Sequence, residues 1–243
     1  MFNIYKTKHM KKFNGPKGVN RNFKNHGINI NRHQLICGMT GSGKSNFVVN
    51  LISQMQCFNH VYIFTKMIQE PIYQMLKEKL GDDLTLERIE NVPNPDELKS
   101  TGQCLCIFDD WLAESKQIFN KLVEYAIVTR KKHFSCVFLT QNFYSVPKVL
   151  REQITYLVLL SMTDKKNLSL IVSTLSIDVE PSTIKRIISN ATKNPLNICI
   201  IDIRNRDLNK KFRRNFNDYY LLEDKNGEPL DTITLFGGSG LLN

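Results

Sequence analysis

The chain has 243 residues, of which 42% are hydrophobic and 23% charged, enough for one sizeable core but short for two catalytic domains. Its 33 basic residues exceed its 23 acidic ones, which excludes an acidic disordered protein and makes a polyanion such as nucleic acid the first candidate partner. The longest apolar run, 154–160, is about a third of the ~20 residues that a spanning helix needs, and no signal peptide is evident, so we expect a soluble protein without a membrane span.

The chain begins with a basic arm, residues 1–33, that contains no acidic residue. The rest of the chain is nearly neutral, with 25 basic and 23 acidic residues. Such an arm suits contact with nucleic-acid phosphates. A lysine-rich composition produced by AT-rich coding sequence explains the excess equally well, and both explanations stay open. The basic residues of the arm are Lys6, Lys8, Lys11, Lys12, Lys17, Arg21, Lys24 and Arg32.

Beyond the arm, apolar strand-like runs alternate with segments of helical periodicity. Strands that are apolar on both faces and alternate with helices predict an α/β fold, with a mostly parallel sheet covered by helices on both sides. After Asp202 the pattern dissolves, so we place a core domain at 34–203 and a basic, Gly-rich tail at 204–243. The predicted strands are 34–37, 60–65, 104–109, 134–140, 154–160 and 196–201, and the predicted helices are 45–54, 70–79, 112–131, 164–174 and 182–190.

Directly after the first predicted strand, residues 38–45 match G-x-x-x-x-G-K-[ST], the Walker A loop. Glycines let backbone N–H groups close around phosphate oxygens, and the following helix presents its positive N-terminal end to the anion. Lys44 is expected to bridge the β- and γ-phosphates of a nucleotide, and Ser45 to bind Mg2+. The predicted cradle consists of Gly38, Met39, Thr40, Gly41, Ser42, Gly43, Lys44 and Ser45.

Two acidic residues, Asp109 and Asp110, follow the apolar run 105–108 at the carboxyl-terminal edge of the predicted sheet. We expect Asp109 to bind the Mg2+, directly or through water, and Asp110 to act as general base on an attacking water. The alternative for Asp110 is a helix N-cap before the segment that begins at Leu112.

The next predicted strand ends at Thr140-Gln141-Asn142. Gln141 is expected to sense the γ-phosphate or orient the water, as a polar residue at a strand tip does in many hydrolysing P-loop proteins. The alternative is a turn residue that satisfies its own backbone.

The six cysteines fall mostly in apolar strand-like runs, without a Cys-x-x-Cys pair or a histidine at zinc-finger spacing. We therefore expect buried thiols in a reducing compartment rather than a metal site. Cys104 and Cys106 lie two residues apart on a strand and are expected to point to the same face as small apolar side chains.

Three segments carry a resemblance to a known group of proteins: LICGMTGSGKSNFVVNLI (35–52), CIFDDW (106–111) and TRKKHFSCVFLTQNFYSVPKVLRE (129–152). Together they resemble the additional-strand, catalytic-acid division of P-loop ATPases. Within it they are most similar to the poxvirus-type genome-packaging ATPases of large double-stranded DNA viruses and virophages, in the FtsK/HerA superfamily. The loop itself is generic, and the order F-D-D, R-K-K-H, T-Q-N and P-x-x-x-R is the specific part. The resemblance covers residues 30–162.

The resemblance implies a RecA-like fold and a homo-oligomeric ring that hydrolyses ATP with Mg2+ to drive double-stranded DNA into a preformed viral capsid. It places the protein at the viral assembly site in the host cytoplasm and leaves its retention in the virion open. Such rings set an arginine against the neighbour's γ-phosphate, for which Arg130 is the first candidate and Arg151 the second. The alternative for Arg130 is a cation favoured by the helix dipole. Asp110 stands where many members of the wider superfamily carry the longer glutamate.

A single core of this size has one nucleotide site, so translocation needs neighbouring subunits. Its DNA contacts are expected to be to phosphates and independent of sequence, through the arm and the basic cluster 204–214.

Other functions fit parts of the sequence. A nucleotide kinase has a similar length and the same loop, but the core lacks an arginine-rich lid. Another DNA-translocating ring ATPase, such as a conjugation or phage-extrusion motor, shares the motifs, and a non-enzymatic capsid or DNA-binding protein could hold a nucleotide in the same loop. A regulatory GTPase fits worse, because no N-K-x-D or T-K-x-D signature occurs.

Overall fold

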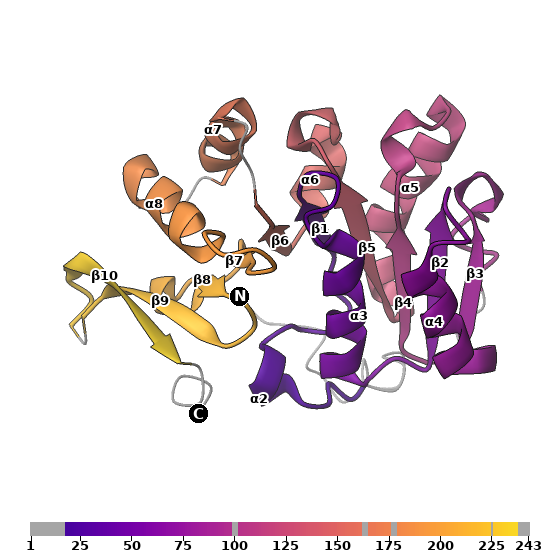
Figure 1. Cartoon of the computed structure of the whole chain (residues 1–243), viewed down its shortest axis with the longest axis horizontal. Coiled ribbons are helices and arrows are strands. Elements are labelled where there is room, and N and C mark those ends of the chain that lie inside the picture. Colours follow the sequence, from indigo (N-terminus) through magenta and orange to yellow (C-terminus); the bar gives the residue numbers. More distant parts are fainter. Residues whose placement is uncertain (1–17, 99–101, 162–164, 176–178, 225, 238–243) are drawn as a thin grey trace, which may run out of the picture.

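One ten-stranded sheet runs through the protein in the computed structural model, which describes residues 18–98, 102–161, 165–175, 179–224 and 226–237 (Figure 1). The strand order is β10-β9-β8-β7-β6-β1-β5-β4-β2-β3. The strands are β1 (Gln34–Cys37), β2 (His60–Thr65), β3 (Leu84–Arg88), β4 (Cys104–Phe108), β5 (Phe134–Thr140), β6 (Tyr156–Leu159), β7 (Cys199–Asp202), β8 (Phe212–Arg214), β9 (Asp218–Glu223) and β10 (Pro229–Gly237).

The six strands from β6 to β3 pair in parallel. Every residue of β1, β4, β5 and β6 is buried, because helices cover both faces of the sheet. The predicted α/β fold with a mostly parallel sheet is confirmed. The edge strand β3 was not predicted, since its sequence LTLER mixes apolar with polar and charged residues, as an edge exposed to solvent allows.

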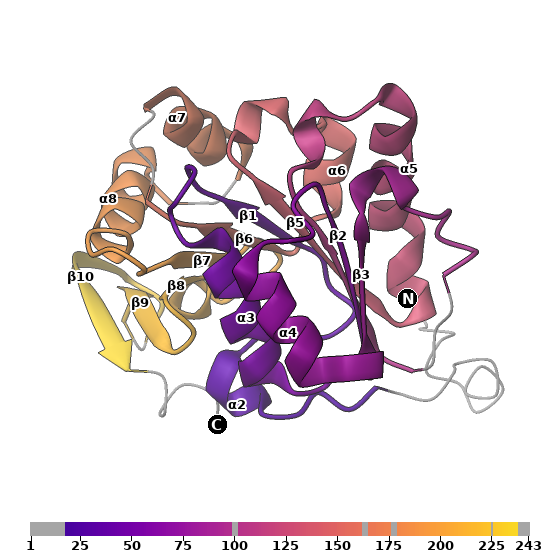
Figure 2. The same ribbon diagram turned by 45° about the vertical axis from the view of Figure 1, so that its right-hand side comes forward.

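Helices pack on both faces of the sheet and enclose two apolar cores (Figures 1 and 2). One core lies under α3 and α4, and the other under α5 to α8. Burial of these apolar faces supplies the main free energy that holds the layers together. The helices are α2 (Phe23–His26), α3 (Lys44–Met55), α4 (Pro71–Leu80), α5 (Lys116–Val128), α6 (Lys148–Gln153), α7 (Lys165–Thr174) and α8 (Pro181–Ala191).

The chain beyond residue 203 continues the sheet, so the predicted loss of regular structure there is wrong. Strand β7 pairs antiparallel with β6, and β8, β9 and β10 follow, each antiparallel to the one before. The basic residues of 204–214 suggested a solvated tail, but Arg213 is only 1% exposed and Lys211 only 6%. These two residues therefore belong to the folded body and not to a free basic surface.

The predicted N-terminal arm is in part folded. Residues 1–17 lie outside the described residues, but His26 and Ile28 are completely buried. Arg213 Nη1 donates a hydrogen bond to the backbone carbonyl of His26 at 2.8 Å, and the Arg213 guanidinium lies over the rings of Tyr156 and Tyr219. The segment from residue 18 to 33 is thus anchored to the C-terminal strands, and the division at residue 33 does not mark where the fold begins.

Two boundaries near the acid pair also differ from the prediction. The strand expected to reach Asp109 ends at Phe108, and the helix expected from Leu112 begins at Lys116. The Ser115 hydroxyl caps this helix by accepting the Ile118 N–H. Asp110 precedes a 3-10 turn in the left-handed conformation, with a φ of 54°, and its side chain makes no capping bond. The N-cap interpretation of Asp110 is therefore wrong.

All six cysteines are buried free thiols, as predicted. Most lie on strands of the sheet, where each fills space as a small apolar side chain. Among the described helices, none has the length and apolar character to cross a membrane.

Candidate functional site

The loop between β1 and α3 has the geometry of a phosphate cradle. Gly41 and Gly43 have φ values of 74° and 95°, in the left-handed region where other residues are strained. Gly38 has no room for a side chain, because a Cβ there would lie 2.5 Å from Ser42 Oγ and 2.9 Å from Leu160 Cβ. The glycines let the backbone turn tightly into α3, whose first N–H groups have no partners within the helix.

Two polar side chains of the loop lack the partners that a phosphate would supply. Lys44 Nζ donates to the backbone carbonyls of Gly38 at 2.9 Å and Met39 at 3.0 Å, which are neutral acceptors and weaker than a charged phosphate oxygen. The Ser42 hydroxyl oxygen is buried and has no hydrogen-bond partner among the described residues. An anion in the loop would satisfy both groups.

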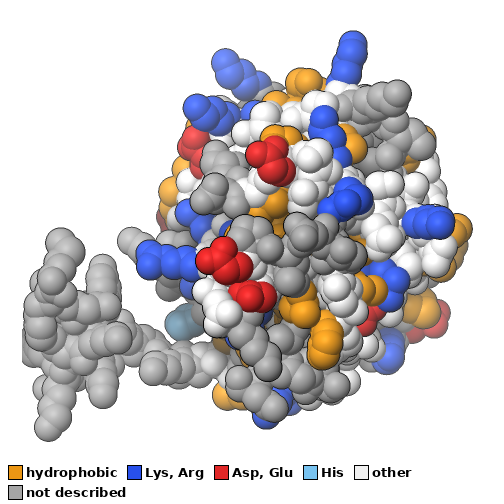
Figure 3. All heavy atoms as spheres, turned by 90° about the vertical axis from the view of Figure 1, so that its left-hand side faces the viewer, with side chains coloured by type: hydrophobic (Ala, Val, Ile, Leu, Met, Phe, Trp, Pro, Cys, Tyr) orange, Lys and Arg blue, Asp and Glu red, His pale blue; other side chains and the backbone are white. Residues whose placement is uncertain are grey.

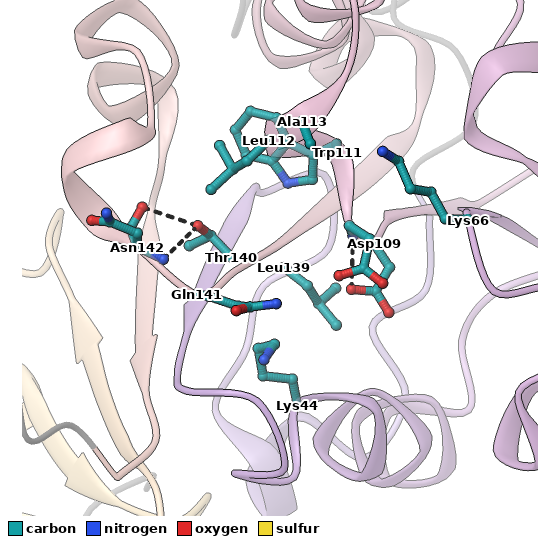
Figure 4. Close-up of a pocket in the computed structure, with 11 residues that line it drawn as sticks. Lys44, Lys66, Asp109, Trp111, Leu112, Ala113, Leu139, Thr140, Gln141 and Asn142 are labelled. Atoms are coloured by element: carbon teal, nitrogen blue, oxygen red, sulfur yellow. Dashed lines mark hydrogen bonds between the residues drawn. The ribbon is translucent and has the colours of Figure 1, made fainter.

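The acid pair follows β4 at the same edge of the sheet (Figure 4). Asp109 is 5% exposed, and its Oδ1 accepts the backbone N–H of Asp110 at 3.0 Å. Asp110 is half-buried and lines the open cavity. Because the two carboxylates differ in burial, they suit different tasks: Asp109 that of a fixed ligand, and Asp110 that of a proton acceptor in contact with solvent.

Tyr73 on α4 is a site residue that the sequence analysis missed. Its side chain is completely buried, and its hydroxyl donates a 2.7 Å hydrogen bond to Asp109 Oδ2 and also interacts with the Ser45 hydroxyl. Burial raises the pKa of Asp109 to about 6, with the nearby Asp110 charge adding to this rise and the Tyr73 bond opposing it. Burial beside Asp109 also raises the pKa of Tyr73, so this hydroxyl remains a donor.

The two predicted Mg2+ ligands, Ser45 and Asp109, are brought together through this tyrosine hydroxyl. A carboxylate and a hydroxyl are the oxygen donors that Mg2+ prefers, and the remaining positions of its shell are commonly filled by water and phosphate. The donor set therefore fits Mg2+.

Gln141 lies between the loop and the acid pair, because β5 is inserted between β1 and β4 in the sheet. Its Oε1 accepts a hydrogen bond from the Thr40 hydroxyl at 3.0 Å. Figure 4 shows its side chain extending over Lys44. The turn after β5 is formed instead by Thr140 and Asn142, whose side chains accept backbone N–H groups. The interpretation of Gln141 as a residue that satisfies its own turn is therefore not supported.

Lys44 of the loop, the acid pair and Gln141 line one cavity of about 380 Å³. Its far wall includes Lys66, which follows β2, and the turn Trp111–Ala113. Lys66 Nζ pairs with Glu114 Oε1 at 2.6 Å, and this hydrogen bond raises the pKa of Lys66. Lys66 was not among the predicted site residues, although its position directly after a predicted parallel strand was a usable signal.

The two arginine candidates lie apart from this cavity. The backbone of Arg130 is in the 3-10 turn Thr129–Lys132, just before β5, at the edge of the sheet opposite the loop, and its side chain lies outside the described residues. The Arg151 guanidinium packs over the Phe143 ring, 5.1 Å from its centroid, within its own subunit. Arg151 does not line the cavity that Lys44, Asp109 and Gln141 share, and the backbone of Arg130 lies at the opposite end of β5 from Gln141.

Solved viral ATPases share this fold. The DNA-packaging ATPase B204 of Sulfolobus turreted icosahedral virus superposes with a TM-score of 0.56 at 12% identity, over 77% of this chain and 98% of that one. B204 of Sulfolobus turreted icosahedral virus 2, solved with ATP-gammaS, gives 0.54 at 13% identity, over the same shares of the two chains. The cytoplasmic domain of the type VII secretion ATPase EccC of Thermomonospora curvata gives 0.53 at 13%, over 88% of this chain and 30% of that one.

At these identities the likeness establishes the fold alone. No protein of curated function is significantly similar to the chain in sequence. A family model described as "Poxvirus A32 protein" matches residues 20–207, which is more than half of the chain and includes the loop, the acid pair and Gln141. This match confirms the resemblance to the poxvirus-type packaging ATPases, and the chain belongs to the Poxvirus A32 protein family.

Proposed function

We propose that this chain is the ATP-hydrolysing subunit of a ring that drives double-stranded DNA into a viral capsid. The observation that carries the proposal is the meeting of Lys44, Asp109 and Gln141 around one cavity, in a chain of the A32 family. The fold is shared with a secretion ATPase as well as with packaging ATPases, so the family match and not the fold favours packaging. The protein then acts where virions are assembled, in the host cytoplasm.

ATP binding replaces hydrogen bonds to neutral carbonyl oxygens by stronger hydrogen bonds to charged phosphate oxygens. Lys44 Nζ leaves the carbonyls of Gly38 and Met39 for the β- and γ-phosphate oxygens, and the Ser42 hydroxyl gains the acceptor that it lacks. Ser45 and Asp109 would hold Mg2+, which when bound neutralises charge on the phosphate oxygens.

Hydrolysis then uses the two polar residues at the strand ends. Gln141 orients a water against the γ-phosphorus, and Asp110 takes the proton that this water loses. A new P–O bond forms to the water oxygen while the bond to the β–γ bridging oxygen breaks, and ADP and phosphate leave. Asp110 suits this role because it is half-buried at the cavity and follows the fixed ligand Asp109 directly.

The γ-phosphate lacks an arginine from its own chain among the described residues that line this cavity. In a ring, a neighbour can supply one, and Arg130 is the candidate that we retain. Its backbone lies at the opposite edge of the sheet, so it can act only on another subunit. Arg151 is less suited, because its guanidinium packs on Phe143 of the same chain.

Contact with DNA phosphates needs exposed basic side chains. The exposed ones differ from those expected from the sequence. Lys211 and Arg213 are buried, and Arg214 pairs with Asp218 at 2.9 Å, so the 204–214 cluster is a poor DNA surface. Figure 3 shows lysine and arginine side chains spread over the face that looks out from the C-terminal strands and α7 and α8, interspersed with a smaller number of acidic side chains. Lys185 and Arg186 on the exposed side of α8 are better candidates. Contacts to phosphates imply binding that weakens strongly with salt.

The nucleotide-kinase alternative requires a mobile arginine-rich lid over the acceptor. The only arginine cluster, 204–214, is built into the sheet through β8 and the buried Arg213. It is therefore not free to close over a substrate.

The test is ATP hydrolysis by the full chain with and without linear duplex DNA. We expect slow hydrolysis alone, faster hydrolysis with duplex, and none with Lys44→Ala, whereas Lys77→Ala on the exposed side of α4 behaves as wild type. Circular dichroism should show both variants folded. Phosphate transfer to a nucleoside monophosphate, without an effect of DNA, would overturn the proposal.

A further inference from the structure

A second cavity lies directly beside the phosphate loop, on the side away from the acid pair. It measures about 240 Å³ and lies between α3 and two turns, one before β7 and one after β8. Gly43 of the loop and Asn46 of the first turn of α3 form one wall, and Leu196, Asn197 and Phe216 face them. The segment after residue 203, expected from the sequence to be a tail, thus helps to build a site beside the loop.

The second cavity lies on the side of the loop where the nucleoside end of a bound nucleotide is expected. Gln141, Asp109 and Asp110 gather on the β5 and β4 side of β1, where the γ-phosphate would react. The second cavity lies on the β6 and β7 side, where Leu160 follows β6 and Ile198 precedes β7. Because the γ-phosphate would lie on the side of the acid pair, the α-phosphate end of a nucleotide in the loop would point toward this second cavity, which Gly43 lines.

The lining suits an uncharged, partly aromatic ligand. None of the described residues that line the cavity is charged, and five of them carry side-chain amides, which offer both donors and acceptors. The Phe47 and Phe216 rings, which both line the cavity, stack with centroids 5.6 Å apart and planes 13° apart. A nucleobase and ribose need this combination of apolar contact and neutral hydrogen bonding. The amide residues are Asn46, Asn50, Gln54, Asn197 and Asn215.

Leu196 lines the cavity in an unusual backbone conformation. It is 67% exposed with a φ of 67°, which is rare for a branched apolar residue, and its Cδ2 lies 3.1 Å from where a Cβ on Gly43 would be. Asn215 holds the turn in place: its backbone N–H bonds Ile198 O at 2.9 Å, and its Oδ1 accepts the Ile198 N–H at 3.2 Å. An exposed leucine kept in a strained turn above the loop indicates a functional constraint.

We propose that this cavity binds the nucleoside part of the nucleotide, with Leu196 covering the base and the asparagine side chains bonding the base or ribose. The inference rests on the proposed function, because it takes the loop to bind a nucleoside triphosphate. It adds the claim that the C-terminal strand extension, through Asn215 and Phe216, completes the nucleotide site.

The test compares ATP with inorganic tripolyphosphate, which has the phosphates but no nucleoside, by calorimetric titration of the full chain. Wild type is expected to bind ATP more tightly than tripolyphosphate. Leu196→Gly removes the side chain while keeping a residue that adopts positive φ without strain, so the variant is expected to fold. We expect it to weaken ATP binding by about tenfold through lost apolar contact, and to leave tripolyphosphate binding within about twofold of wild type.

Asn46→Ala serves as a second variant and Met75→Ala, exposed on α4, as the matched control. Asn46→Ala should also lower ATP affinity selectively, and Met75→Ala should change neither ligand. Two outcomes would overturn the inference while the proposed function stands. In the first, wild type binds ATP and tripolyphosphate with equal affinity. In the second, both cavity variants keep the full wild-type preference for ATP over tripolyphosphate. Failure of wild type to bind either ligand would overturn the phosphate-loop assignment and the proposed function with it.

Discussion

The hydroxyl of Tyr73 donates a 2.7 Å hydrogen bond to Asp109 Oδ2, which ties α4 to the acid pair after β4. The same hydroxyl interacts with Ser45, so one buried tyrosine touches both residues that we expect to hold Mg2+. Partners of this kind fix the orientation of a ligand carboxylate, although they do not touch the metal themselves.

Tyr73→Phe is therefore expected to weaken Mg2+ binding while keeping the ring packing. Loss of an outer partner of a metal ligand typically costs about 10- to 100-fold in metal affinity. The measurement is the Mg2+ concentration that gives half of maximal binding of a non-hydrolysable ATP analogue. Tyr144→Phe, an exposed tyrosine, is the control. A half-saturation equal to wild type would show that Tyr73 only fills space.

The ionisation of Asp109 sets a pH dependence of stability. Because its pKa in the folded protein is about 6, above the ordinary value of 3.8, the folded state binds this proton more tightly than the unfolded state does. The stability associated with this group is present below the ordinary pKa and is lost as the pH rises through about 6.

Asp109→Asn removes this charge, so the metal-free variant should be more stable than wild type at pH 8, by about 2–3 kcal/mol. The difference should shrink toward pH 4, where the carboxyl of wild type is protonated. Urea denaturation without Mg2+ at the two pH values measures it. Equal stabilities at pH 8 would mean that the buried carboxylate costs the fold nothing.

Arg213 joins the N-terminal segment to the C-terminal strands, through the His26 carbonyl and the Tyr156 and Tyr219 rings. Arg213→Met is expected to lower the free energy of unfolding by about 2–4 kcal/mol, because the buried carbonyl loses its charged donor. It should also expose residues 18–33 to protease. Arg206→Met, at an exposed position, should change neither property. If Arg213→Met resists urea and protease as well as wild type does, Arg213 does not hold residues 18–33 to the C-terminal strands.

The sequence predicted the central strands well for a physical reason. A strand buried on both faces must be apolar throughout, so β1, β4, β5 and β6 stand out as runs. The strand β3 at one edge and β8 near the other carry polar or charged residues and lack this pattern. Arg213 was predicted to lie in a solvated basic tail, because a basic cluster in the sequence gives no sign that one of its members is buried.

Some residues of the site could be predicted from the sequence and others could not. Those that could lie in or next to motifs with fixed spacing, which placed them at one edge of the predicted sheet: Lys44, Ser45, Asp109 and Gln141. Tyr73 comes from an amphipathic helix whose apolar residues all look like core positions. Leu196 and Asn215 depend on turn geometry and on the antiparallel strands, which the sequence analysis did not foresee.

The trans role of Arg130 is open to a mixing experiment. Arg130→Ala subunits keep an intact loop but lack the arginine, whereas Lys44→Ala subunits keep the arginine but lack the lysine. If Arg130 acts on the neighbour, mixed rings regain part of the ATP hydrolysis that each variant alone has lost. Hydrolysis of the mixture equal to the sum of the separate variants would argue against action across the interface.

Movement along duplex DNA driven by ATP hydrolysis can be measured as displacement of a triplex-forming strand from linear duplex. Wild type is expected to release the third strand only with ATP and Mg2+, and Lys44→Ala is expected not to release it although it remains folded. ATP hydrolysis that proceeds at the full rate while the third strand stays bound would contradict the account.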